Sequence, residues 1–455
     1  MRIRFWGTRG SLPKPGRTTL RYGGNTSCVE VRTAAATLIV LDCGTGAHEL
    51  GQALLETERH PLRGHLLISH THWDHIQGFP FFAPLFTRDT EWDIYAPGGL
   101  GRRLEATLAG QMEYTYFPVT LEQLDATVRY HDLVEGAFEI EDVHVAARFL
   151  NHPALTLGYR LEVGGASLVY AVDHEPHAGH HTDAGDPDRV RPVHQEDQRH
   201  IEFLGGADLV IHDATYTLDE YPKRVGWGHS PVEYAVDVAV AARARRLALF
   251  HHAPLRDDDA VDRLVAESRA RVTAQGSTLE VFAAAEGQVV ELPERGQREG
   301  GRSDDTARRL MATGGGLGLK TVLIVDDAPD IVTLLMRALD GEGFRLLSAE
   351  DGESALRIAR AERPDLILLD WILPGRNGLE VCRALRAETD PKLRDVPVVL
   401  ITAQTGPEHV AAGFAAGATD YLTKPFKVAH VRSRVRGWLL RTSATANGNE
   451  AGEPR

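Results

Sequence analysis

Four side chains that can bind metal ions stand within six positions of this sequence. The segment LLISHTHWDHIQGF, residues 66–79, places them directly after a short apolar run, at His70, His72, Asp74 and His75. Neutral imidazole binds zinc, manganese or iron, and a carboxylate adds the negative charge needed to hold a second divalent ion nearby. A loop with this spacing can point two ligands at each of two cations. The pattern therefore predicts a two-metal site, and a polar turn with incidental histidines is the alternative.

Further candidate ligands follow other apolar runs. The runs 37–41, 66–69, 167–172, 208–212 and 247–250 have the length and composition of buried strands and end in polar clusters. His152 in FLNHPALTLGYR, Asp173 in LVYAVDHEP and His251 in LALFHHAP each follow such a run. His252 competes with its neighbour for the role of ligand. We favour His251, because it directly ends the strand, and expect His252 to support a ligand instead.

Together these segments resemble the metallo-β-lactamase fold, whose H-x-H-x-D-H motif stands here at residues 70–75. The resemblance covers nearly all of residues 1–292. It implies an αββα sandwich that binds two divalent transition metals, zinc or else manganese or iron. It also implies one ion held by His70, His72 and His152, a second held by Asp74, His75 and His251, and Asp173 between them. Asp42, in LDCGTG, looks like a carboxylate that holds a ligand histidine, and a turn-forming aspartate is the alternative.

Two later segments, VIHDATYT and WGHSPVEYAVDVA, resemble ribonuclease Z and the cyclic phosphodiesterase of phosphonate catabolism. The resemblance implies that His229 protonates the leaving oxygen and that Asp213 orients its imidazole, and it gives Asp74 a catalytic role as well. A histidine at a helix start capped by Ser230 is the alternative. Ribonuclease Z commonly carries a tRNA-gripping arm after its GYR segment. Here residues 158–173 leave room only for a hairpin that turns at 164–165, so small or cyclic phosphodiesters are the expected substrates.

The last third of the sequence has a different pattern. The runs TVLIVDD, PDLILLD, VPVVLITA and TDYLTKP alternate with helical stretches at 331–339, 353–361 and 379–387. This alternation predicts a doubly wound (βα)5 domain with a parallel sheet, so the chain as a whole is expected to be of the α/β class. Residues 320–441 resemble a response-regulator receiver domain. The resemblance implies phosphorylation of Asp370, Mg²⁺ held by Asp326, Asp327 and Asp370, and a switch made of Thr402, Tyr421 and Lys424.

Chemistry supports that ligand set, because three carboxylates at one sheet edge repel one another unless a cation neutralises them. The sequence contains no histidine-kinase catalytic segment, so we expect a separate histidine kinase, a phosphotransfer protein or a small phosphodonor to supply the phosphoryl group. Residues 293–319 are rich in glycine, arginine and aspartate and are predicted to form a flexible linker, and residues 442–455 a disordered tail. Phosphorylation of the receiver domain is then expected to affect the hydrolase domain through docking or through formation of a homodimer. A rigid connection between the two domains is not expected.

The amino-acid composition limits the binding partners and the cellular compartment that can be expected for this protein. With 50 basic and 64 acidic residues the net charge is −14, which argues against nonspecific binding to nucleic acid or to an anionic membrane. Three cysteines cannot build a disulfide framework. There is no leader and no apolar run of membrane-spanning length, so the chain is expected to be cytoplasmic.

The leading hypothesis is a two-component effector with a dinuclear metallohydrolase, a phosphodiesterase, as its output. Two alternatives remain open, a thioester or lactone hydrolase of the glyoxalase type, and a binding module whose receiver acts as a phosphate sink. The histidine-rich loop between His174 and His200 is predicted to be solvated, with pocket lining or metal binding as the alternative. Tyr114, Tyr116 and Phe117 are expected either to stack on a ligand base or to pack in the core.

Overall fold

The computed structural model describes residues 1–58, 61–98, 103–177, 182–183, 186–190, 195–293, 320–403, 407–424, 426, 431–432 and 434–439. The chain folds into two compact units, Met1–Ala312 and Thr313–Arg455. The predicted tail 442–455 lies outside the described residues, and so does the predicted linker except for Pro293. Each unit is described by itself.

The first unit contains two sheets of seven strands. One sheet has the order β16-β1-β2-β3-β4-β5-β6. Its strands β3, β4, β5 and β6 run parallel to one another, and the others pair antiparallel. The bounds are β1 (Arg2–Gly7), β2 (Cys28–Arg32), β3 (Leu38–Leu41), β4 (Leu62–Leu67), β5 (Thr90–Pro97), β6 (Thr127–Leu133) and β16 (Val289–Glu291).

The second sheet has the order β15-β14-β13-β10-β9-β8-β7. Strands β10, β13, β14 and β15 are parallel, whereas β7 to β10 form antiparallel hairpins. The predicted hairpin at Gly164–Gly165 joins β9 to β10, and both glycines have positive φ, as a tight turn requires. The bounds are β7 (Gly136–Ile140), β8 (Val143–Phe149), β9 (Leu157–Val163), β10 (Ala166–Ala171), β13 (Leu209–Asp213), β14 (Arg246–Phe250) and β15 (Glu280–Ala283).

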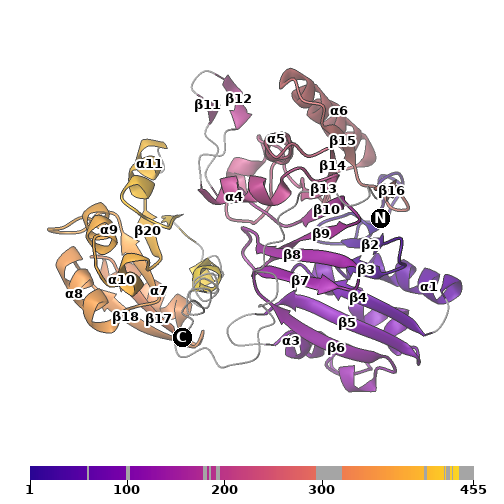
Figure 1. Cartoon of the computed structure of the whole chain (residues 1–455), viewed down its shortest axis with the longest axis horizontal. Helices are drawn as coiled ribbons and strands as arrows, with labels where there is room; N and C mark the ends of the chain where they lie inside the picture. The colour runs from indigo at the N-terminus through magenta and orange to yellow at the C-terminus, as the bar shows by residue number, and fades with distance from the viewer. Residues whose placement is uncertain are drawn as a thin grey trace, which may run out of the picture. The chain divides into compact units, whose positions relative to one another are not determined.

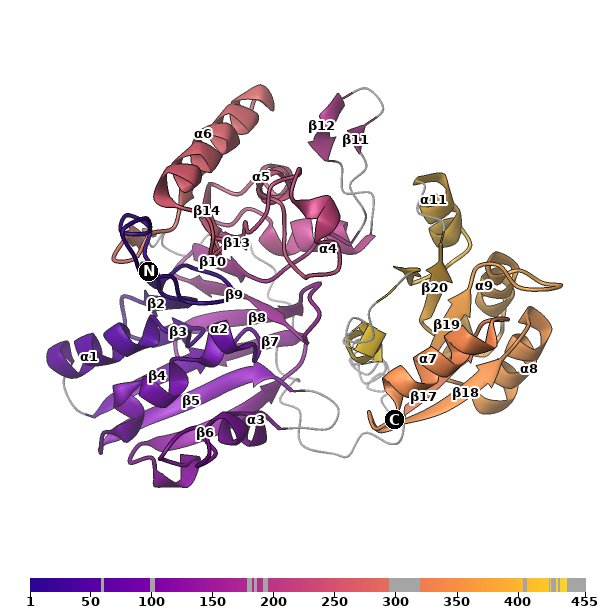
Figure 2. The ribbon, with the colours of Figure 1, turned by 180° about the vertical axis from the view of Figure 1, so that it is seen from behind.

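Helices cover the outer face of each sheet (Figures 1 and 2). On the first sheet, α1 (Ala47–Thr57), α2 (Trp73–Ile76), α3 (Leu104–Gln111) and the turns η1 (Phe79–Phe81) and η2 (Ala83–Phe86) share one apolar cluster with β3, β4 and β5. On the second, α4 (Gln195–Leu204), α5 (Val232–Ala241) and α6 (Asp258–Ala274) share another with β10, β13, β14 and β15. A short ribbon of β11 (Thr182–Asp183) and β12 (Asp186–Val190) precedes α4, and the remaining turns are η3 (Leu121–Gln123) and η4 (Tyr221–Lys223).

The two sheets meet face to face. The rings of Phe5 in β1 and Phe250 in β14 lie 6.1 Å apart, and the Tyr159 hydroxyl donates across the interface to the carbonyl of Ile68 at 2.7 Å. These contacts complete the predicted αββα sandwich. The predicted strand runs correspond to β3, β4, β10, β13 and β14. Because the carboxyl ends of parallel strands meet at one edge, the residues after these strands come together.

The second unit is the predicted doubly wound domain. Its parallel sheet has the order β18-β17-β19-β20-β21, and β17 is buried over almost its whole length because both faces are covered. One face packs against α8 and α9. The strands are β17 (Lys320–Val325), β18 (Phe344–Ala349), β19 (Leu366–Asp370), β20 (Val398–Thr402) and β21 (Asp420–Thr423). The helices are α7 (Pro329–Leu339), α8 (Gly352–Glu362), α9 (Gly378–Arg386), α10 (Pro391–Arg394) and α11 (Pro407–Ala415), and residues 431–432 and 434–439 are also helical.

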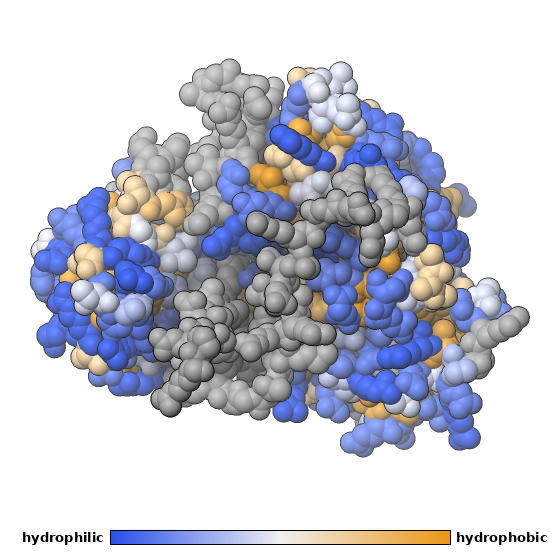
Figure 3. Space-filling model, in the orientation of Figure 1, coloured by the Kyte–Doolittle hydropathy of each residue, from blue (hydrophilic) through white to orange (hydrophobic). Residues whose placement is uncertain are grey.

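The surface in view is mostly hydrophilic, and its apolar residues occur in small groups (Figure 3). Across the described parts of the chain, no helix combines the length and the apolar character that a bilayer crossing needs.

Candidate metal centre and phosphorylation site

The candidate ligands of the first unit lie where strands of both sheets end. His70 follows β4, Asp173 follows β10 and His251 follows β14, while α2 presents Asp74 and His75 within one helical turn. Asp173 and His251 adopt φ values of 56° and 60°, a left-handed conformation that is unusual for residues other than glycine. Such backbone outliers persist only where the surrounding structure enforces them, and they concentrate at functional sites.

Asp173 lies between two groups of imidazoles. Its Oδ2 atom is 3.5 Å from His70 Nε2 and 3.6 Å from His152 Nε2. Its Oδ1 atom is 3.3 Å from His75 Nε2 and 3.1 Å from His251 Nε2. Each carboxylate oxygen therefore faces one pair of nitrogens, the arrangement expected of a residue that bridges two cations.

The remaining candidate ligands complete the two groups. His72 Nδ1 lies 3.1 Å from His152 Nε2 in the first group, and Asp74 Oδ2 lies 3.1 Å from His251 Nε2 in the second. Donor atoms of His70, His72, His152 and Asp173 fall within 4.8 Å of one another, as do those of Asp74, His75 and His251. His72 is exposed, and Trp73 beside it is 72 % exposed, so the ligand set opens to solvent on this side.

The imidazole nitrogens and the carboxylate oxygen of the candidate ligands indicate that metal ions fit here. His70 Nε2, His75 Nε2 and Asp173 Oδ1 are buried and have no hydrogen-bond partner. A buried polar atom without a partner costs about 1–3 kcal/mol, so three at one point require an explanation. Coordination of cations would satisfy all three atoms at once.

Electrostatics favour the same interpretation. Burial lowers the pKa of His70 well below its ordinary value and lowers the pKa of His152 to about 3, so both rings are neutral. Burial would raise the pKa of Asp173, but His251 and His75 outweigh it and keep the carboxyl ionised. The neutral rings of His70 and His152 beside the ionised Asp173 are ligand types that divalent transition metals bind.

Contacts behind the ligands fix which ring nitrogen faces the centre. His75 Nδ1 lies 2.7 Å from Asp42 Oδ2, so Asp42 stands where the sequence predicted a supporting carboxylate. His152 Nδ1 donates to the carbonyl of Gly228 at 2.9 Å. Thr215 Oγ1 lies 3.0 Å from His251 Nδ1. In each case the hydrogen bond occupies Nδ1 and leaves Nε2 for a cation.

The opening segment of the chain also supports the centre. The backbone N–H of Ser11 donates to Asp74 Oδ2 at 2.6 Å. A Cβ atom on Gly10 would lie 2.2 Å from the His251 ring, so this loop packs directly on a ligand and has no room for a side chain there. His252 holds the loop through its backbone, because its N–H donates to Thr8 and its carbonyl accepts from Gly10.

The His252 ring differs from its predicted role. Its Nε2 lies 2.9 Å from the carbonyl oxygen of Ala284, to which it donates, so the ring serves the backbone between β15 and β16 rather than a ligand side chain. Burial lowers the pKa of this ring to about 3.

His229 and Asp213 form a pair beside the candidate metal centre. Asp213 Oδ2 lies 2.8 Å from His229 Nδ1, and Asp213 Oδ1 accepts from the hydroxyl of Thr215 at 2.7 Å. The His229 ring stacks on that of His251 at 4.8 Å, and its Nδ1 is 3.9 Å from Asp173 Oδ2. Burial would lower the pKa of His229, but Asp213 and Asp173 raise it to about 9, so the ring carries a proton at neutral pH.

The second unit gathers its own charged cluster at the ends of parallel strands. Carboxylate oxygens of Asp326, Asp327 and Asp370 lie within 4.8 Å of one another. Lys424 Nζ donates to Asp326 Oδ2 at 2.7 Å and to Asp370 Oδ2 at 2.8 Å. Burial raises the pKa of Asp370, and Lys424 opposes this shift. Three carboxylates and one ammonium leave an excess of negative charge that a hard cation would neutralise.

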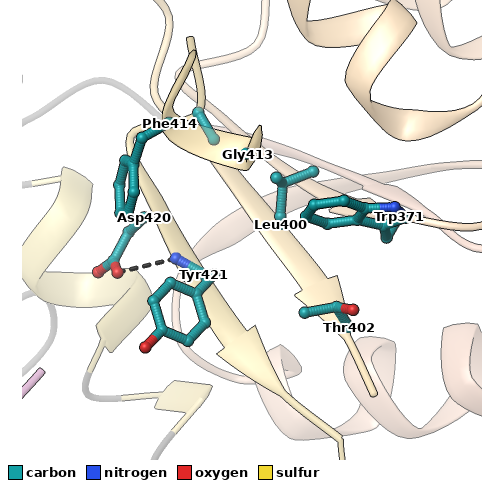
Figure 4. Close-up of a pocket in the computed structure, with 8 residues that line it drawn as sticks. Trp371, Leu400, Thr402, Gly413, Phe414, Asp420 and Tyr421 are labelled. Carbon is teal, nitrogen blue, oxygen red and sulfur yellow. Dashed lines mark hydrogen bonds between the residues drawn. The ribbon is translucent and has the colours of Figure 1, made fainter. Parts of the chain in front are cut away.

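Thr402 and Tyr421 lie on the neighbouring strands β20 and β21 (Figure 4). The backbone N–H of Lys424 donates to the carbonyl of Thr402 at 2.7 Å, which ties the two strand ends together. A small pocket opens between these strands and α11, and Trp371, Leu400 and Gly413 contribute to its lining. Two of the three predicted switch residues, Thr402 and Tyr421, therefore line this pocket together with Trp371, the residue after Asp370.

Each of the two units contains a segment that matches a known protein family. Residues 37–252 match the model described as a beta-lactamase superfamily domain, and residues 322–436 match the one described as a response regulator receiver domain. This chain joins a beta-lactamase superfamily domain to a receiver domain. The DNA-binding response regulator MtrA of Mycolicibacterium smegmatis is 47% identical over 120 residues, which cover 26% of this chain and 50% of that protein. The chain thus spans about half the length of the curated relatives it matches.

Two solved structures are similar to part of this chain. The metallo-beta-lactamase fold protein YhfI from Bacillus subtilis is 18% identical, with 64% of this chain and 99% of that chain covered and a TM-score of 0.45. Human tRNase Z, short form, is 22% identical, with 64% and 100% covered and a TM-score of 0.42.

The beta-lactamase superfamily domain contains a second histidine cluster, in the segment that the sequence predicts to be a solvated loop. That prediction is wrong for His174, which is buried, and His180 and His181 lie outside the described residues. His174 Nδ1 accepts from the backbone N–H of Asn151, and its Nε2 donates to the Tyr234 hydroxyl. Tyr234 donates in turn to Asp197 at 2.9 Å.

This cluster differs from the metal centre in one decisive respect. Donor atoms of His174, His177 and Asp197 lie within 4.8 Å of one another, yet among the described residues no buried side-chain atom of this cluster lacks a hydrogen-bond partner. His200 and His212 also pair through their Nε2 atoms at 3.0 Å. Hydrogen bonds therefore account for the cluster without an ion, and it acts as the scaffold behind the loops of His152 and Asp173.

The three aromatic residues after α3 separate into two groups. Tyr114 is 82 % exposed and Tyr116 is 74 % exposed, so neither packs in the core. Phe117 packs edge-on against Phe81 at 5.3 Å. The Gln111 side chain donates to the carbonyl of Ile76 at 3.1 Å, which ties this end of α3 to α2 of the metal centre.

Proposed function

We propose that this chain is a two-component effector whose beta-lactamase superfamily domain hydrolyses small phosphodiesters, cyclic ones included, under control of phosphorylation at Asp370. The observation that carries the proposal is the position of Asp173, with one oxygen facing His70 and His152 and the other facing His75 and His251. The pair of His229 and Asp213 beside that carboxylate supplies a proton donor.

The proposed ligand set would hold two divalent ions, zinc or else manganese or iron. Bound there, the ions would supply Lewis-acid activation of water and of the phosphate oxygens. The protein's own contribution is orientation and proton transfer. Asp42, Thr215 and Gly228 hold the ligand rings, and His229, protonated at neutral pH, gives its proton to the leaving oxygen.

The proton donor favours a phosphodiesterase over a thioesterase. An alkoxide leaves poorly unless it is protonated, whereas a thiol has a pKa of about 8.5 and leaves as a thiolate without help. A buried histidine held in its charged form by Asp213 serves the first reaction and adds little to the second. A lactone, like a diester, expels an alkoxide, so the substrate panel separates those two reactions.

Metal analysis followed by a substrate panel tests this proposal. We expect close to two transition-metal ions per chain, because seven donor residues converge on one centre. Turnover of bis(p-nitrophenyl) phosphate should exceed that of thioesters and lactones in the same preparation. A protein with two ions that cleaves the thioesters or lactones and leaves the diester intact would contradict the assignment.

The receiver domain is proposed to take its phosphoryl group from a separate histidine kinase or phosphotransfer protein. Asp370 would be the acceptor, Mg²⁺ would be held by Asp326, Asp327 and Asp370, and Lys424 would hold the phosphoryl oxygens. A phosphoryl group on Asp370 would carry about two negative charges, where the free carboxylate carries one, on the strand next to the one that carries Thr402. Thr402 and Tyr421 are thus placed to report the change through β20 and β21.

Phosphorylation is expected to change the diesterase rate or the assembly state. Acetyl phosphate or beryllofluoride with Mg²⁺ should shift the turnover rate or the sedimentation coefficient. The reason is that the charge added at Asp370 draws Lys424 away from its present contacts with the carboxylates of Asp326 and Asp370. The Asp370→Asn variant should show no shift. Asp395→Asn is the matched control, since Asp395 is exposed and pairs with Arg394 at the surface. Unchanged rate and mass in the phosphorylated wild type would leave the receiver as a phosphate sink.

A further inference from the structure

Glu175 lies two residues after Asp173, and its carboxylate is buried within the domain, at 4 % exposure. Three donors reach it from the segment that leads to His229. Its Oε1 atom accepts from the Gly226 N–H at 2.6 Å and from the Tyr221 hydroxyl at 2.7 Å, and its Oε2 atom accepts from the Gly228 N–H at 2.7 Å. A carboxylate held by three converging donors forms strong, geometrically specific hydrogen bonds.

The backbone of this segment is shaped around the carboxylate. Gly226 and Gly228 have φ values of 81° and 86°, which turn both N–H groups toward Glu175. Successive amides in such conformations form a concave anion site. A Cβ atom on Gly228 would lie 2.2 Å from His152 Nδ1, so this position has no room for a side chain.

Glu175 also joins the loops of two metal ligands. Its backbone N–H donates to the carbonyl of Asn151 at 2.8 Å, and the Asn151 side chain donates back to the Glu175 carbonyl at 2.8 Å. Asn151 immediately precedes His152, and Glu175 follows Asp173. One residue therefore connects the His152 loop, the Asp173 loop and the segment that carries His229.

We propose that Glu175 is a positioning residue that sets the reactive geometry of His229 and the ring orientation of His152. It fixes the 226–229 segment, so that the Gly228 carbonyl accepts from His152 Nδ1 and His229 faces Asp173. The role in proton donation rests on the proposed diesterase function. The role in orienting His152 does not, because it acts on the metal ligand itself.

A carboxylate is required at this position because the Gly226 N–H, the Tyr221 hydroxyl and the Gly228 N–H all donate to it. In a Glu175→Gln variant the amide nitrogen would face either Gly228 N–H or the pair of donors at Gly226 and Tyr221. One of those contacts would become a clash of two donors, while the volume of the side chain stays the same. The variant thus removes the interaction without opening a cavity.

The experiment compares Glu175→Gln with wild type on aryl phosphodiesters whose leaving groups range from p-nitrophenol to phenol. A misplaced proton donor costs most when the leaving group is poor, so the loss in kcat should be about tenfold greater for phenol than for p-nitrophenol. Zinc affinity, measured by chelator competition, should fall by about 10- to 100-fold, the usual cost of losing a contact that orients a ligand. KM should change little.

Two further variants make the outcome specific. Tyr221→Phe removes one of the three donors and should give a smaller loss in the same direction. Glu30→Gln removes another buried carboxylate, one that bonds Trp6 and Arg32, and should leave both the leaving-group dependence and the zinc affinity as in wild type. Thermal unfolding reports whether each variant folds.

The outcomes separate the two proposals. If wild type cleaves none of the esters but Glu175→Gln weakens zinc binding, the diesterase proposal fails and the positioning role stands. If wild type is active and Glu175→Gln matches it in both readouts, the positioning role is overturned. An equal loss for all leaving groups with unchanged zinc affinity also overturns it, because neither His229 nor His152 would then depend on Glu175.

Discussion

Replacement of Asp173 by alanine is expected to abolish hydrolysis and to remove at least one metal ion from each chain. Asp173 is the residue whose two oxygens face both groups of imidazoles. Without it, two cations would repel each other with no anion between them. Lewis-acid stabilisation is worth several kcal/mol, so loss of one ion should reduce kcat by at least about 10³-fold.

Metal content by plasma emission and turnover of bis(p-nitrophenyl) phosphate measure this effect together. Asp208→Ala is the matched control, because Asp208 is another buried aspartate but precedes β13 and bonds Ser167 at the opposite end of the sheet. That variant should keep both ions and lose stability only. If Asp173→Ala retained two ions and full turnover, Asp173 would not bridge the centre.

Some parts of this site could be predicted because their signal is local. The spacing of residues 70–75 is compact, and the runs before Asp173 and His251 are apolar enough to mark strand ends. Parallel strands then bring those ends to one edge whatever the rest of the chain does. The choice of His251 over His252 followed from the same logic, since His251 is the residue directly after the end of the strand, at Phe250.

Other contacts could not be predicted, because they join segments that no periodicity relates. Ser11 reaches Asp74 across 63 positions of sequence, and Glu175 reaches Gly228 across 53. Both depend on the loops that the sandwich brings to one edge. A signal for Gly228 was present in GWGHS, but a glycine alone does not reveal that a histidine ring lies 2.2 Å from where a Cβ atom would be.

The second histidine cluster shows how composition can mislead. A run that contains His174, Glu175 and His177 has the polarity of an exposed loop. Packing of α4 and α5 against it buries His174, and the Tyr234 hydroxyl from α5 satisfies its ring. The partner residues come from distant parts of the sequence, so the burial of this loop is a tertiary effect. The receiver domain has no such complication, because its candidate site residues lie at or directly after the ends of β17, β19, β20 and β21.

Replacement of His229 by alanine is expected to preserve the metal ions and to slow hydrolysis of diesters with poor leaving groups, such as phenyl diesters, by about 10²–10⁴-fold, the range of a general acid. The retained ions follow from its position, since the His229 ring stacks on His251 while Nδ1 is bound to Asp213. His144→Ala, at a half-buried histidine that pairs with Glu139 outside the candidate site, should match wild type in metal content and in turnover. Loss of metal from His229→Ala would identify His229 as a ligand instead.

The pH dependence of the hydrolysis rate tests the same role of His229 as the proton donor. The pKa of His229 is raised to about 9, so the ring is protonated below that pH and loses its proton above it. The rate should therefore fall on the basic side as the pH rises through this value. Bound cations add positive charge near the ring and move the fall below about pH 9. His229→Ala should lack this basic limb, and Asp213→Asn should move it to lower pH, because removal of the partner carboxylate destabilises the charged ring. A basic limb that is identical in wild type and His229→Ala would assign the proton to another group.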